Sequence, residues 1–338
     1  MLKPLFMWAG GKTKLIEEYS SRNLLPEEFD SYIEPFVGAG AMFTWAYEKN
    51  PDAQFYLNDS NQYIMAIYDA VKTDEVTFCN IVDRYQKDYL ALPGPEMQAK
   101  NAKGKTIWVP NPAGATNKEI EKKYREGRSS DWNKLWKENV GYRTRRSYYF
   151  RVRQRYQENN FQRFSTFDSA TLYFLMKTGF NGIWQTKKDT DLFNTPCGTM
   201  RHKTRIYDRE NVMEWSKALQ NVELTTGDFM ETLRYAFGRE KCFIFMDPPY
   251  RGSYADFGVD FDDRLQQRVV DYLNCAKHIG SDVMMSNRDV GDGFFTQRQG
   301  TNIIETFDVT YTLGAKKQKA DGTYEATKAK EILMIGKK

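Results

Sequence analysis

The stretch KCFIFMDPPY, residues 241–250, decides the fold. Its five apolar residues, Cys242 to Met246, have the length and character of a fully buried strand. The tetrapeptide DPPY follows directly, so it is expected at the carboxyl end of that strand, where open α/β sheets bind their ligands. The structural alternative is a Pro-Pro turn that ends a buried strand, with Asp247 as a cap.

The DPPY tetrapeptide suits an amino group as the substrate. An adenine amino group is a poor nucleophile, because its lone pair is delocalised into the ring. The carboxylate of Asp247 and the main-chain carbonyl of Pro248 can each accept one amino hydrogen and direct the lone pair at a methyl donor. The prolines Pro248 and Pro249 restrict the backbone and lack a competing N–H, while Tyr250 offers a face to an extruded base. These four residues are the catalytic candidates.

A glycine turn, EPFVGAG at residues 34–40, precedes a helical pattern. Its small residues allow a ligand to approach the backbone at a helix start. A dinucleotide fingerprint would need a third glycine where Phe43 stands, which disfavours nicotinamide and flavin enzymes. The segment WAGGKT, residues 8–13, is not a nucleotide-hydrolysing loop, because Phe6 replaces the first glycine. The next apolar stretch ends at Asp59, about where an acidic residue would hold ribose hydroxyls.

Charge is distributed unevenly along a chain whose net charge is only +4. Residues 96–163 contain 17 lysines and arginines against 7 acidic residues, a balance of +10, so the rest of the chain stands at −6. Aromatic residues alternate with basic ones in YRTRRSYYFRVRQRY, residues 142–156. A solvated surface is the alternative, but this mixture favours a face that contacts phosphates, with Arg143, Arg145 and Arg146 as candidates.

The order of patterns predicts a split α/β domain. Strand-like and helical stretches alternate over residues 1–72 and again over 169–338, whereas 73–168 carries polar helical stretches and a Pro/Gly-rich loop. We therefore expect a catalytic domain interrupted by a mostly helical insertion. The chain has no apolar run near the ~20 residues of a membrane span, and its first residues lack a signal-peptide stretch. Four cysteines without a CxxC pair and two histidines disfavour a metal site.

The segments WAGGK, EPFVGAGAMF, LND, GDF and DPPY together make the chain similar to the Dam-like family of adenine-specific DNA methyltransferases. The resemblance covers nearly the whole chain outside the insertion. It implies a Rossmann-like methyltransferase sheet with an inserted target-recognition domain and a β-hairpin, and S-adenosylmethionine (AdoMet) as the cofactor. It further implies N6 methylation of a flipped adenine in double-stranded DNA, without a metal. We expect a cytoplasmic monomer or weak dimer.

The resemblance also implies roles for individual residues around the cofactor. The AdoMet pocket would be lined by Trp8, Gly10, Gly11, Lys12, Pro35, Phe36, Gly38 and Gly40, with Asp59 at the ribose and Asp228 and Phe229 at the adenine. For Asp228, the alternative is a residue that only caps a turn.

Residues 178–182, TGFNG, resemble the family segment that begins a hairpin that enters DNA. We expect this hairpin within residues 178–200, with its second arm ending near residue 196. Phe180, Asn181, Ile183 and Gln185 are the DNA-binding candidates there. Members that methylate GATC carry a lysine and an arginine where this chain has Met7 and Gln185. Two side chains that could bond guanine are thus absent, and glutamine pairs more naturally with adenine, so we predict a target other than strict GATC.

Two other functions fit part of this pattern. Similar strand-end motifs act on other planar amino groups, so the substrate could be RNA or a protein glutamine. A catalytically inactive DNA-binding protein could also keep the fold. Aspartate rather than asparagine at position 247, together with the intact motifs, favours DNA adenine.

Overall fold

The computed structural model describes residues 2–8, 12–94, 96–111, 136–137, 143–159, 163–187, 190–201, 204–252, 261–311, 317–318, 324–325 and 327–337. The chain forms two compact units, which we describe separately. The first unit comprises residues Met1–Asp69 and Glu214–Lys338, and the second Ala70–Met213. No helix in the described ranges is long and apolar enough to cross a bilayer.

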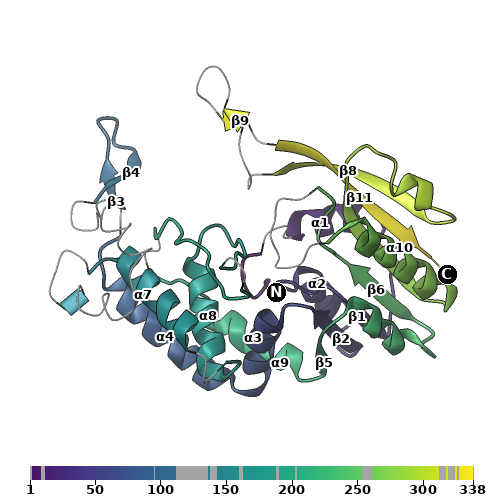
Figure 1. Ribbon diagram of the computed structural model, residues 1–338, viewed down its shortest axis with the longest axis horizontal. Coiled ribbons are helices and arrows are strands. Elements are labelled where there is room, and N and C mark those ends of the chain that lie inside the picture. The colour runs from purple at the N-terminus through teal and green to yellow at the C-terminus, as the bar shows by residue number, and fades with distance from the viewer. Residues whose placement is uncertain are drawn as a thin grey trace. The chain divides into compact units, whose positions relative to one another are not determined.

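A seven-stranded sheet organises the first unit, with strand order β5-β2-β1-β6-β7-β11-β8 (Figure 1). Five strands run parallel, and β11 pairs antiparallel with both of its neighbours. The α/β sheet predicted from the sequence is confirmed, and the apolar run Cys242–Met246 is its buried strand β6. The other strands are β1 (Ser31–Glu34), β2 (Gln54–Asp59), β5 (Val222–Thr226), β7 (Asp282–Asp289), β8 (Ile303–Tyr311) and β11 (Thr327–Gly336), and a separate pair joins β9 (Lys317–Gln318) to β10 (Tyr324–Glu325).

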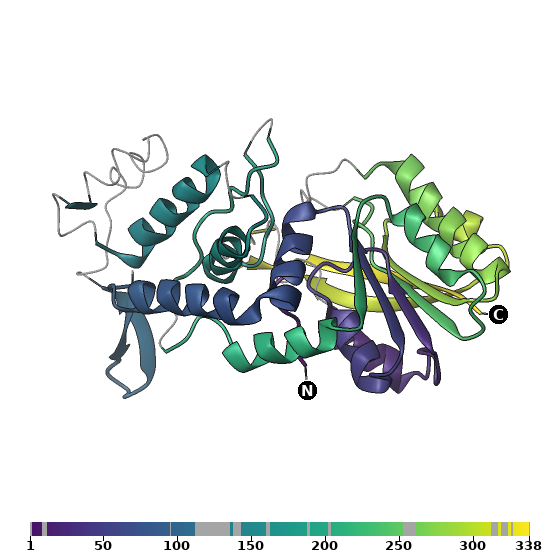
Figure 2. The ribbon, with the colours of Figure 1, turned by 90° about the horizontal axis from the view of Figure 1, so that it is seen from below.

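Apolar side chains alternate between the two faces of this sheet, as the period of two in a strand requires. Ile33 and Ile244 belong to a core cluster that includes side chains of helix α10 (Asp263–His278) and the 3₁₀ helix η2 (Phe229–Ala236). On the opposite face, Phe243 packs with Trp45 of helix α2 (Ala41–Lys49). Helices therefore cover both faces (Figure 2). The unit also contains α1 (Thr13–Ser21), η3 (Thr296–Arg298), and parts of α3 (Gln62–Thr73) and α9 (Arg209–Leu219).

The described part of the second unit is mainly helical. It contains α4 (Glu75–Leu90), α7 (Arg145–Glu158), α8 (Thr166–Thr178) and the antiparallel hairpin of β3 (Glu96–Lys100) and β4 (Thr106–Pro110). Its boundaries at 69/70 and 213/214 differ from the 72/73 and 168/169 expected from the sequence. The difference arises because α8 packs with α4 and α7, through pairs such as Tyr85 with Phe174 (ring centroids 4.9 Å apart). Residues 178–200 therefore belong to this unit as well.

Candidate active site

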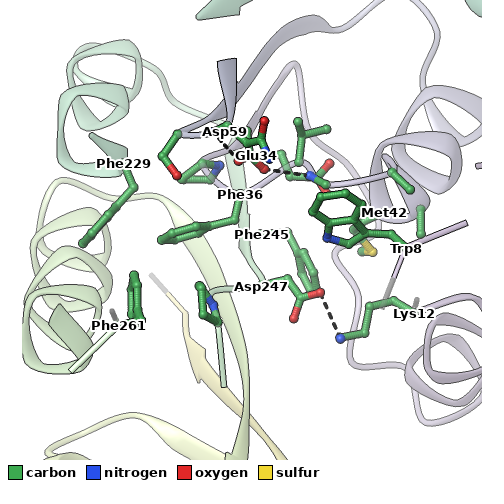
Figure 3. A pocket seen from close by; sticks show the side chains of 18 of the residues that line it. Trp8, Lys12, Glu34, Phe36, Met42, Asp59, Phe229, Phe245, Asp247 and Phe261 are labelled. Carbon is green, nitrogen blue, oxygen red and sulfur yellow. Dashed lines mark hydrogen bonds and ion pairs between the residues drawn. The ribbon is translucent and has the colours of Figure 1, made fainter. Parts of the chain in front are cut away.

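A pocket of about 210 Å³ lies in the first unit at the carboxyl ends of β1, β2 and β6 (Figure 3). Three strand ends meet there because carboxyl ends of parallel strands share one edge of a sheet. Ten of the residues predicted from the sequence line it: Trp8, Lys12, Pro35, Phe36, Gly38, Asp59, Asp228, Phe229, Asp247 and Pro249. Pro248 and Tyr250 adjoin Asp247 without lining the pocket, and Gly10 and Gly11 lie outside the described residues.

The glycine turn is held against strand β2 by backbone hydrogen bonds. The Val37 N–H donates to the carbonyl of Asn58 at 2.8 Å, and the Gly38 N–H donates to the carboxylate of Asp59 at 3.1 Å. Gly38 has a φ of +49°, and a Cβ built there would lie 3.1 Å from the indole of Trp8. A side chain at this position would be strained by the positive φ and would crowd the Trp8 ring, which agrees with a backbone that a ligand approaches closely.

Gly40 occupies a different environment from the one predicted. It does not line the pocket; a Cβ built on it would lie 2.5 Å from the Trp215 ring and 3.0 Å from the Tyr68 hydroxyl. Its φ of +73° also belongs to the left-handed region. We therefore attribute the glycine at position 40 to helix packing and turn geometry, and not to cofactor contact.

Asp59 presents a carboxylate at the end of β2. Its Oδ1 accepts the Asn61 N–H at 2.9 Å and its Oδ2 accepts the Gly38 N–H. Burial raises the pKa of Asp59 to about 6, although these backbone hydrogen bonds counteract the rise. A carboxylate oxygen can accept more than one hydrogen bond, so Asp59 can still accept from the hydroxyls of a sugar.

Aromatic rings form one wall of the pocket (Figure 3). The Phe36 and Phe229 ring centroids lie 5.0 Å apart, and Phe261 stands 6.1 Å from Phe36. Arg268, a residue for which the sequence offered no signal, lies over the Phe229 ring at 5.2 Å. It also donates to Asp228 Oδ2 at 2.8 Å, while Asp228 Oδ1 caps η2. Asp228 is thus a turn cap, as the alternative proposed, and a pocket residue as well.

Asp247 is held from two sides. Lys12 Nζ lies 2.9 Å from its Oδ2, and the Ser286 hydroxyl donates to its Oδ1 at 2.6 Å. Lys12 is only 3% exposed, and its ammonium group stands 4.7 Å from the centroid of the Tyr250 ring. The carboxylate is thus fixed in orientation but keeps lone pairs for an incoming donor.

Tyr250 is also fixed from the sheet. Its hydroxyl donates to Glu331 Oε2 at 2.8 Å, and Glu331 is buried in β11. Burial and the carboxylates of Asp247 and Glu331 raise the pKa of Tyr250 well above its usual range, so the phenol keeps the proton that it donates. The Pro249 carbonyl accepts from Gln266 Nε2 at 2.7 Å.

The sequence patterns did not identify Glu331, Gln266 and Ser286 as supports of the DPPY turn. Each is buried. Two of them gave only a weak signal. Glu331 stands beside the apolar run of the last strand, and Gln266 lies on the apolar face of an amphipathic helix. Neither pattern says which buried partner the polar group meets.

In the second unit, the predicted hairpin of residues 178–200 carries two isolated antiparallel bridges, Gly179 with Cys197 and Thr186 with Phe193. Helix α7 supports it, because Arg153 and Tyr149 both donate to the carbonyl of Thr195, at 2.8 and 2.9 Å. At its start, Phe180 is 41% exposed, Asn181 has a φ of +53°, Ile183 is half-buried and Gln185 is exposed.

The three arginines predicted to contact phosphates differ in environment. Arg145 is a correction to that prediction: its guanidinium donates to the carbonyls of Leu90, Leu92 and Met200. It also lies 5.3 Å from the Tyr89 ring, so its donors serve the interior of the second unit. Arg143 is exposed, with Nε donating to the Trp136 carbonyl, and Arg146 is partly buried.

The chain is similar to known proteins over most of its length. The profile of the D12 class N6 adenine-specific DNA methyltransferase family matches residues 8–106 and 115–313. The chain is 26% identical to the type II methyltransferase M.MjaIII of Methanocaldococcus jannaschii, over 96% of this chain and 97% of that protein. It is 25% identical to a DNA adenine methylase of Vibrio cholerae over 83% of this chain and 80% of the relative. The type II methyltransferase M.CviBI of Paramecium bursaria Chlorella virus NC1A is 24% identical, over 82% and 80%.

Proposed function

Because the chain belongs to the D12 class N6 adenine-specific DNA methyltransferase family and is an adenine-specific DNA methyltransferase, we propose that it binds AdoMet in the pocket of the first unit. We further propose that it methylates an adenine extruded from double-stranded DNA. The observation that carries the proposal is the meeting of Asp247, the glycine turn and Asp59 around one pocket at the ends of three strands.

The pocket residues fit the parts of AdoMet. The cradle at Gly38, which a Cβ would fill, permits close approach of a ligand to the backbone. Asp59 would accept from the ribose hydroxyls. The Phe36 and Phe229 rings would pack beside the adenine, and Asp228, already oriented by Arg268, would accept from its amino group. When bound, AdoMet supplies a methyl group activated by the positive sulfonium.

The chemistry assigned to this chain's own residues is orientation of the substrate amino group. A carboxylate has about four acceptor positions, and Lys12 and Ser286 use one on each oxygen of Asp247. Asp247 therefore retains acceptors for an amino hydrogen of the target adenine, and the Pro248 carbonyl would take the second. Both hydrogen bonds direct the lone pair of N6 out of conjugation, which stabilises the transition state more than the ground state. The Tyr250 ring would stack on the extruded base.

We propose that DNA is engaged by residues 178–200, where the exposed ring of Phe180 would fill the space that the extruded base leaves. Asn181, Ile183 and Gln185 would flank it. Met7 is 51% exposed and Gln185 is also exposed, so both are available to bases without offering guanine a cationic partner. This supports a target other than strict GATC.

Cofactor binding tests the pocket assignment directly. Equilibrium dialysis with labelled AdoMet should show that Asp59→Ala and Phe36→Ala weaken binding at least about tenfold, the effect of losing about 1.4 kcal/mol. Asp247→Ala is the matched control, since it alters the same cavity beside the methyl-transfer position and should keep the affinity within a few-fold. Equal AdoMet affinities for wild type, Asp59→Ala and Phe36→Ala would show that AdoMet does not bind in this pocket.

A further inference from the structure

A basic hairpin in the second unit lies within the basic segment 96–163 but contains none of the arginines predicted to contact phosphates. Strands β3 and β4 are joined by a turn, residues 101–105 (Figure 1). Lys100, Lys103 and Lys105 are all exposed. Residues 96–111 contain one acidic residue, Glu96. Such a density of exposed cations on a two-stranded ribbon favours a polyanionic partner.

The lysines stand on an ordered turn. The Asn101 side chain accepts from the N–H groups of Lys103 and Lys105 at 3.0 and 2.9 Å. The backbone of Asn101 exchanges two further hydrogen bonds across the turn, with Lys105 and with Gly104. An ordered turn loses less conformational entropy on binding than a mobile loop would.

The negative charge of the hairpin's acidic residue, Glu96, is balanced by an arginine at the end of the hairpin opposite the turn. Glu96 forms an ion pair with Arg201, whose guanidinium also lies 5.5 Å from the Trp108 ring. Asn111 donates to the Gly94 carbonyl at 2.9 Å and ties the base of the hairpin to its own unit. The lysines at the tip are thus left without a carboxylate on the described part of the ribbon.

The register separates a polar face from an apolar one. Gln98 and Lys100 pair with Trp108 and Thr106, so they share one face, and Lys100 Nζ donates to the Thr106 hydroxyl at 2.7 Å. Residues 97, 99, 107 and 109 alternate to the other face. Beside the Trp108 ring and Glu96, the first face carries amide, hydroxyl and ammonium donors next to the lysine tip, and such groups bind phosphate oxygens.

We propose that the β3–β4 hairpin is a DNA-contacting arm, whose Lys100, Lys103 and Lys105 bind backbone phosphates of the duplex. The inference rests on the proposed function and extends it, since it adds a contact separate from residues 178–200. Phosphate contacts position the protein and raise affinity without reading sequence. The arm should therefore strengthen binding to target and non-target DNA alike.

The salt dependence of DNA binding gives the size of the effect. Each phosphate contact contributes about −0.9 to the slope of log K against log salt, so three contacts account for about −2.7. At roughly 0.15 M salt the same relation predicts a loss of about 100-fold in affinity when all three are removed.

The test compares two triple variants. Lys100→Gln/Lys103→Gln/Lys105→Gln removes the cations of the tip. The matched control, Lys49→Gln/Lys217→Gln/Lys241→Gln, removes three exposed lysines of the first unit that precede β2, β5 and β6, away from the strand ends that form the pocket. Affinity for an unmethylated duplex would be measured by fluorescence anisotropy from low to moderate salt, together with AdoMet affinity and the melting temperature.

The hairpin variant should bind DNA about 100-fold more weakly at moderate salt, with a shallower slope, while AdoMet affinity and melting temperature stay at wild-type values. The slope of log K against log salt for the control variant should differ from the wild-type slope by no more than about 0.9, the value of one phosphate contact. If wild type methylates DNA and both triple variants show the same slope and affinity, the arm is refuted and the proposed function stands. If wild type neither binds nor methylates DNA, the proposed function fails and the arm fails with it.

Discussion

The hydrogen bond between Tyr250 and Glu331 predicts a measurable coupling between the DPPY turn and the last strand of the sheet. Tyr250→Phe removes the hydroxyl that donates to Glu331 Oε2 at 2.8 Å. The buried Glu331 carboxylate then loses this hydrogen bond. A hydrogen bond to a charged group contributes about 1.5–3 kcal/mol. We expect the free energy of unfolding to fall by about that amount, and kcat for methylation to fall roughly tenfold if the ring loses its orientation.

Glu331→Gln keeps an acceptor of the same shape, so it should lower the free energy of unfolding by less, about 1 kcal/mol. The double variant should be less impaired than the sum of the two single variants, because both remove the same interaction. Urea denaturation and single-turnover methylation would be measured for all four proteins, with 2-aminopurine at the target position to report base extrusion. Strictly additive effects on stability and on kcat would show that Glu331 does not hold Tyr250.

Three further results are expected. The pKa of Asp59 is raised to about 6, so AdoMet affinity should fall as pH drops through that value, because protonation removes an acceptor; calorimetric titration between about pH 5 and 8 checks this, and a flat profile refutes it. Gly40→Ala should destabilise the fold by about 1–3 kcal/mol in chemical denaturation, since its Cβ would meet Trp215; an unchanged midpoint contradicts the packing role. Arg145→Ala should lower the melting temperature but leave the salt slope of DNA binding unchanged, because its donors serve carbonyls; a slope shallower by about one would make it a phosphate contact after all.

Short-range patterns were enough to predict the sheet and the pocket. The apolar run before Asp247 and the small residues of the glycine turn are contiguous in sequence, and both lie at strand ends because parallel strands share an edge. The strand at residues 242–246 therefore has the bounds expected. The same reasoning placed Asp59 at the next strand end.

Long-range packing set the limits of the prediction. Gly40 belongs to a glycine turn of the kind that binds ligands, yet its neighbour in the fold is Trp215, which is distant in sequence. Arg145 lies in a basic run that favours phosphate contact, but the fold brings three backbone carbonyls to it. Glu331 supports Tyr250 from a strand that the local pattern marks only as apolar. No periodicity encodes which buried polar groups meet.

Methyl transfer to DNA is the most direct test of the central claim. The protein would be incubated with labelled AdoMet and unmethylated genomic DNA, beside an Asp247→Ala variant whose AdoMet affinity has been shown to be unchanged, and the modified adenines would be mapped by sequencing. We expect N6-methyladenine at a defined sequence with wild type and none with the variant. Methylation that survives in Asp247→Ala, or its absence with wild type across salt concentrations and DNA forms, would contradict it.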